Sequence, residues 1–120
     1  MRRFFDRPAF GWLVATIVGL AVTAVLAEPR VVDLPIRGGV LPGQQRVIRV
    51  QQGDVVTLRW TSDRALTVHL HGYDIEQRIT PGTAATMSFT AGATGRFSVE
   101  IHASEGHRAS TVAYLEVHPR

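Results

Sequence analysis

The sequence predicts an all-β domain, a sandwich or barrel of short antiparallel strands, behind an apolar N-terminal segment. After residue 28, apolar side chains recur with a period close to two, as in half-buried strands. Turn-forming pairs such as Gly38-Gly39, Pro42-Gly43 and Pro81-Gly82 separate these segments at roughly ten-residue spacing. The longest candidate helix, residues 103–110, contains Gly106 and small residues, so we expect a loop there. These features are typical of an antiparallel sandwich or barrel.

The first quarter of the chain resembles an export signal. The run from Ala9 to Ala27 carries no charged residue, follows Arg2-Arg3, and ends in small residues that suit a signal peptidase. Its 19 residues also come close to the length that spans a bilayer, so an uncleaved anchor is the alternative. We therefore predict a signal peptide or N-terminal membrane-anchor helix over 1–27 and one domain over 28–120. Either version places the domain in the periplasm, with membrane contact only through an uncleaved segment 9–27.

The domain is predicted to contain seven or eight strands. Their approximate ranges are 31–36, 46–50, 55–60, 66–71, 75–79, 86–89, 97–102 and 111–117. Pro35 suits the first of them to the edge of a sheet, because proline lacks the N–H that an inner strand must donate. Gln52-Gly53-Asp54 is expected to form a tight connection between the second and third strands.

Alternation assigns the two faces of the strands near residues 66–71 and 97–102. Their apolar face is predicted to carry Leu66, Val68, Leu70, Phe97, Val99 and Ile101. Their polar face is predicted to carry Thr67, His69, His71, Ser98, Glu100 and His102. The assignment assumes no bulge, since one inserted residue would exchange the faces.

The composition excludes several classes of site. There is no cysteine, so disulfides, thiolate metal sites, iron–sulfur clusters and a blue-copper centre are excluded. Three arginines and one aspartate before residue 28 supply +2 of the net charge of +3. The remaining arginines stand singly between apolar residues rather than in a cluster, so we predict no nucleic-acid binding.

His69-x-His71 is the strongest candidate site. Two residues apart on one strand, these imidazoles share a face at about 7 Å between Cα atoms, close enough to bind one metal ion. His102 and Glu100 have the same relation on another strand. If the two strands are neighbours, His69, His71 and His102 could converge with Glu100 on Cu(II) or Zn(II). The alternative is that all three histidines are surface residues without a ligand.

Other polar residues are weaker candidates. His107 is either a labile ligand or a solvated loop residue, His118 is expected on the surface, and Met87 in the core. The segment Gly72-Tyr73-Asp74 is either a simple turn or a source of hydrogen bonds to a ligating histidine. We find no phosphate-binding glycine loop, no Gly-x-Ser-x-Gly and no paired carboxylates, so no catalytic residue or organic cofactor is expected.

The order of several segments resembles the cupredoxin family over about residues 31–118. The matching segments are Val50-x-x-Gly53-Asp54-x-Val56-x-Leu58-x-Trp60, Val68-His69-Leu70-His71-Gly72-Tyr73-Asp74, Pro81-Gly82, Met87-Ser88-Phe89, Gly95-x-Phe97-x-Val99 and Leu115-Glu116-Val117. The resemblance implies a Greek-key sandwich of two sheets. Members of the family are mostly exported copper proteins that carry electrons.

The ligands of the usual copper site are replaced in this sequence. The resemblance places Ile101 where the ligand cysteine stands, and Thr67 near the first ligand histidine. The later histidine and the axial methionine would fall near Ser104 and Ala109. The His-x-His-Gly segment is instead similar to copper-ligand strands of multicopper oxidases. The resemblance therefore implies the fold and not the blue site.

Two functions follow as hypotheses. The first is a periplasmic module that binds a metal, copper first, through His69, His71 and His102, for carriage or sequestration rather than catalysis. The second is a metal-free scaffold that presents a loop such as 103–110 to a periplasmic or inner-membrane partner protein. A small metal-dependent oxidase would need a substrate pocket, for which the domain has little room, so we expect no enzyme.

Overall fold

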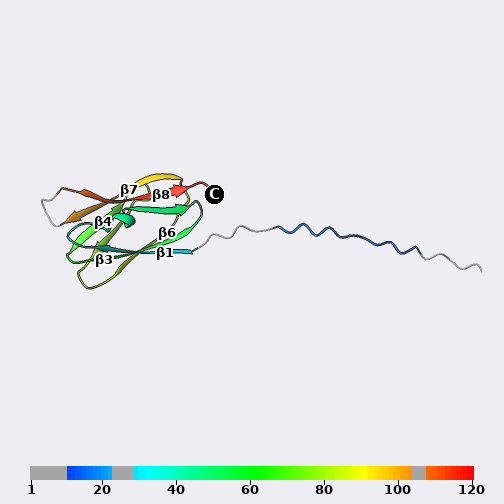
Figure 1. Ribbon diagram of the computed structural model, residues 1–120, viewed down its shortest axis with the longest axis horizontal. Helices are drawn as coiled ribbons and strands as arrows, with labels where there is room; N and C mark the ends of the chain where they lie inside the picture. Colours follow the sequence, from blue (N-terminus) through cyan, green and yellow to red (C-terminus); the bar gives the residue numbers. More distant parts are fainter. Residues whose placement is uncertain (1–10, 23–28, 104–107) are drawn as a thin grey trace, which may run out of the picture.

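The computed structural model describes residues 11–22, 29–103 and 108–120 (Figure 1). The described residues contain eight strands and one short 3₁₀ helix, so the all-β prediction is confirmed. The elements are β1 (Pro29–Ile36), η1 (Gly43–Gln45), β2 (Val47–Gln51), β3 (Val55–Ser62), β4 (Leu66–Leu70), β5 (Ile75–Ile79), β6 (Ala85–Thr90), β7 (Gly95–Ala103) and β8 (Ser110–His118).

The strands form two sheets that face each other as a sandwich (Figure 1). One sheet has the order β1-β3-β6 and the other the order β2-β8-β7-β4-β5. The pairs β1–β3 and β2–β8 are parallel, and the remaining pairs are antiparallel. The parallel pairs depart from a purely antiparallel sandwich because the chain changes sheets between β1 and β2 and again between β2 and β3. As predicted from its proline, β1 is an edge strand.

The core lies between the sheets and follows the predicted alternation. Inward side chains of β3 and β4 are buried: Val56, Leu58, Trp60, Leu66, Val68 and Leu70. Val99 and Ile101 of β7 are buried beside them, and Phe97 packs against the same cluster. One irregularity falls between Val99 and Glu100, but it affects only the pairing of β7 with β8. The pairing of β7 with β4 is continuous, so the polar faces of these strands stay as predicted.

The predicted export segment is covered only in part. Residues 11–22 form neither helix nor strand, and residues 1–10 and 23–28 lie outside the described residues. In the described part of the chain, no helix has the length and apolar character that crossing a membrane requires. A signal peptide or anchor over 1–27 stays a prediction.

Candidate metal site on the five-stranded sheet

β4 and β7 are hydrogen-bonded neighbours, which is the condition that the sequence hypothesis required. In their antiparallel register, His69 stands opposite Glu100 and Thr67 stands opposite His102. On its other side, His69 stands opposite Glu76 of β5. The polar face of β4 is thus bordered by carboxylates on both sides.

His69 of β4 and His71, the first residue after β4, lie side by side. Their ring centroids are 4.1 Å apart, with 47° between the ring planes. The side chain of His69 is only 18% exposed, and its Nε2 lies 3.3 Å from Oδ1 of Asp74. The pair therefore offers two imidazoles at close range, one of them oriented by an aspartate.

Glu100 lies within ion-pair distance of His71. Its Oε2 lies 3.1 Å from Nε2 of His71, a distance that suits an ion pair if the ring is protonated. That nitrogen is enclosed, yet it makes no hydrogen bond. An enclosed imidazole nitrogen without a partner carries a desolvation cost that a proton shared with the carboxylate, or a bound cation, would relieve.

The turn after β4 positions Asp74. Gly72 has φ +84° and Asp74 has φ 54°, both in the left-handed region that glycine and aspartate tolerate. The Tyr73 hydroxyl is hydrogen-bonded away from the histidines: it donates to the Ala93 carbonyl at 2.8 Å and accepts from the Ala93 amide at 3.2 Å. Gly72-Tyr73-Asp74 therefore forms a turn whose aspartate contacts His69, and a role for that contact beside a metal ion stays a prediction.

His102 lies on the same face but not with the pair. The His71 amide donates to the carbonyl of Ser98, four residues before His102 on β7. Four residues of strand measure about 13 Å, so His71 and His102 stand on opposite sides of His69. His102 is exposed. The register brings Glu100, rather than His102, to the histidine pair, and alternation alone did not distinguish between them.

The remaining sequence candidates fall in different places. His107 lies outside the described residues. His118 is exposed, with Nε2 3.4 Å from Glu116 Oε1, and Met87 is buried in the core, as expected for both. Glu100 was already a candidate from the sequence, whereas Glu76 was found only by the register of β5 against β4, for which the sequence offers no local signal.

The cluster contains side chains of the kinds that bind metal ions, but they are not arranged around a common point. Within residues 11–22, 29–103 and 108–120, no group of three or more His, Cys, Asp or Glu side chains is already placed to hold a metal ion. His69, His71 and Glu100 nevertheless provide two imidazoles and one carboxylate, a donor set that suits Cu(II) or Zn(II). The unpartnered nitrogen of His71 makes this set chemically compatible with such an ion.

No protein-family model and no curated protein matches this chain. Its fold is similar to several solved structures. A heme-copper terminal oxidase solved by cryo-EM has TM-score 0.60 and 24% identity, over 73% of this chain and 64% of that one. A multi-copper oxidase from Pseudomonas thermotolerans has TM-score 0.61 and 22% identity, over 78% of this chain and 30% of that one. The periplasmic domain of cytochrome oxidase subunit II from Bradyrhizobium japonicum has TM-score 0.58 and 12% identity, over 72% and 82%.

These likenesses confirm the cupredoxin-like sandwich that the sequence predicted. The chain has a cupredoxin-like β-sandwich fold, and it spans less than two thirds of the terminal-oxidase and multi-copper-oxidase chains to which it is similar. Where the resemblance places a cysteine ligand, Ile101 is buried in the apolar core. Thr67 occupies the position near which the resemblance expects the first ligand histidine. Ser104, near the position expected for the later histidine, lies outside the described residues.

Proposed function

We propose that this chain is an exported cupredoxin-like module that binds one metal ion, Cu(II) first, through His69 and His71. The observation that carries the proposal is the pairing of two imidazoles whose enclosed, unpartnered nitrogen faces Glu100 at 3.1 Å. The similarity of the fold to copper-containing oxidases supports copper as the first ion to test. Export is supported by the predicted leader and by the similarity to a periplasmic domain.

The third ligand is proposed to be Glu100 rather than His102. Glu100 is the cross-strand partner of His69 and contacts His71, so a small rotation of side chains would bring all three groups together. His102 lies about 7 Å along the strands from the level of His69 and about 13 Å from that of His71, on the side of His69 away from His71. Asp74 is proposed to orient His69 by accepting the proton of the ring nitrogen that does not bind the ion.

We propose carriage or sequestration of the ion, and no catalysis. Imidazole and carboxylate ligands without a thiolate do not tune copper as a blue electron-transfer centre does. The described cavities, moreover, are lined by residues other than His69, His71 and Glu100.

The test is a Cu(II) titration of the full chain in a neutral detergent, followed by calorimetry and EPR. We expect one ion per chain, with hyperfine structure from two nitrogens. His69→Ala/His71→Ala should abolish binding, and Glu100→Gln should weaken it by about tenfold or more. His102→Ala should bind like the wild type, and His118→Ala, which removes an exposed histidine of β8, is the matched control.

Equal affinity of the wild type and the double variant would reject the metal site. The metal-free scaffold that binds a periplasmic or inner-membrane partner protein would then be the function to pursue. Loss of binding in His102→Ala, with Glu100→Gln unaffected, would restore the three-histidine set instead.

A further inference from the structure

An exposed third histidine lies next to the histidine pair, on the side away from His71. His102 of β7 stands opposite Thr67, which precedes His69 by two residues on β4. Diagonal neighbours on paired strands are about 7–8 Å apart, a distance that two imidazole side chains can bridge to one ion. His71, His69 and His102 therefore follow one another along the sheet in steps of about 7 Å, with His69 in the middle.

Glu100 borders both steps of this row. It stands opposite His69, its Oε2 lies 3.1 Å from Nε2 of His71, and it precedes His102 by two residues on the same face of β7. Two donor sets consequently overlap: His69 and Glu100 with His71, and the same two residues with His102. Because the sets share two ligands, an exchange of His71 for His102 leaves an ion attached to the protein throughout.

The two donor sets differ in how open they are to another molecule. The side chain of His69 is only 18% exposed, and its Nε2 lies beside Asp74. Nε2 of His71 is enclosed. His102, in contrast, is exposed. An incoming ligand therefore meets less protein at His102 than at the pair.

We propose that His69, Glu100 and His102 form a second, outer position for the ion, through which it enters and leaves the inner position at His69, His71 and Glu100. This inference rests on the proposed function and adds the route of exchange. On the way out, the bond from copper to the His71 nitrogen breaks and a bond to a neutral nitrogen of His102 forms. The ion stays Cu(II), and no proton or electron is transferred. The receiving molecule is expected to supply nitrogen or oxygen ligands, which compete with imidazole for Cu(II).

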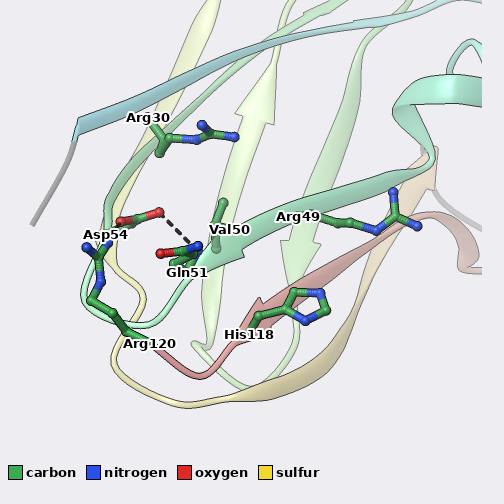
Figure 2. A pocket seen from close by; sticks show the side chains of 7 residues that line it. All are labelled: Arg30, Arg49, Val50, Gln51, Asp54, His118 and Arg120. Carbon is green, nitrogen blue, oxygen red and sulfur yellow. Dashed lines mark hydrogen bonds and ion pairs between the residues drawn. The ribbon is translucent and has the colours of Figure 1, made fainter.

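His118 offers a matched control elsewhere on the same sheet. It is exposed and its Nε2 lies 3.4 Å from Oε1 of Glu116, so it also combines an imidazole with a carboxylate. It lines a cavity of about 340 Å³ together with Arg30, Arg49 and Arg120 (Figure 2). Its strand, β8, is separated from β4 by β7. Removal of His118 should therefore leave both proposed positions intact.

The first test compares Cu(II) titrations and EPR spectra of variants of the full chain in a neutral detergent. His71→Ala should still bind one ion, about tenfold or more weakly than the wild type, with hyperfine structure from two nitrogens because His102 replaces His71. His71→Ala/His102→Ala should show one nitrogen at most. His71→Ala/His118→Ala, the matched control, should behave like His71→Ala.

The second test follows the transfer of Cu(II) to the chromogenic chelator pyridylazoresorcinol by stopped-flow absorbance. His102→Ala should keep the affinity of the wild type within about twofold but transfer copper about tenfold more slowly, whereas His118→Ala should transfer it at the wild-type rate.

The outcomes separate this inference from the proposed function. A wild type that binds no copper would reject both. If the wild type binds copper but His71→Ala/His102→Ala keeps two nitrogens, this inference alone is overturned. The same holds if His102→Ala transfers copper as fast as the wild type.

Discussion

At the scale of single residues, Gly72 determines whether the turn beside the histidine pair can form. A Cβ at this position would lie 2.2 Å from Cδ1 of Phe97, and the residue has φ +84°. Gly72→Ala must therefore displace a packed ring and also adopt a strained backbone. We expect a loss of about 2–4 kcal/mol in the free energy of unfolding, measured with urea.

Gly82→Ala is the matched control for this substitution. Gly82 has φ +78° but nothing within 4 Å of the added Cβ, so it should lose only the backbone contribution of about 1–2 kcal/mol. Because Tyr73 and Asp74 follow Gly72 directly, Gly72→Ala should also shift the ring signals of His69, while Gly82→Ala should not. Equal losses in the two variants would show that Phe97 does not constrain the turn.

At the scale of elements, Asp63 joins two connections of the sandwich. Its Oδ2 accepts the amide of Gly38 at 3.0 Å, which links the turn after β1 to the end of β3. That hydrogen bond, helped by the neighbouring Arg64 guanidinium, holds the pKa of the Asp63 carboxyl below its ordinary value of 3.8. The ionised carboxylate therefore stabilises the fold above that value, and the contribution is lost as the pH falls through the lowered pKa.

Asp63→Asn should remove this pH dependence, since its amide oxygen accepts the same hydrogen bond but carries no charge. We expect the difference in unfolding free energy between wild type and variant to shrink as the pH falls from about 6 to about 3, as urea titrations would measure. A difference that stays constant over this range would contradict a charge-dependent role for Asp63.

The sequence predicted which segments form strands, and which faces are polar, better than it predicted which residues stand opposite one another on paired strands. Period-two alternation placed His69, Glu100 and His102 on polar faces, because it depends only on residues near in sequence. Which of the last two stands opposite His69 depends on the register of β4 against β7, a long-range property without a local pattern. A shift of two residues would have kept every face and exchanged the two partners.

At the scale of the whole molecule, the topology gathers charges that the sequence disperses. Arg30, Arg49 and Arg120 stand singly among other residues, so the sequence indicated no basic cluster. The start of β1 and the end of β8 nevertheless lie at the same end of the sandwich (Figure 1), and β2 pairs in parallel with β8. The crossing from β1 to β2 puts Arg30 and Arg49 on edge strands of different sheets, and the end of the chain brings Arg120 to the same cavity.

The same topology predicts that the two sheets unfold together. Leu115 of β8 and Trp60 of β3 belong to different sheets, but both are fully buried in one core cluster. Leu115→Ala removes packing from that shared core, so we expect a loss of about 2–5 kcal/mol. A Trp12→Phe background makes Trp60 the only tryptophan, so its fluorescence during urea unfolding reports on β3, while amide NMR signals report on β8.

Both reporters should move to the same lower urea midpoint in Leu115→Ala, because neither sheet can keep its inner face dry without the other. Thr111→Ala, an exposed position on β8, should stay within about 0.5 kcal/mol of the background and serves as the control. If the β8 signals shifted while the Trp60 transition stayed in place, the sheets would unfold separately. In that case the shared core would not couple the stability of the two sheets.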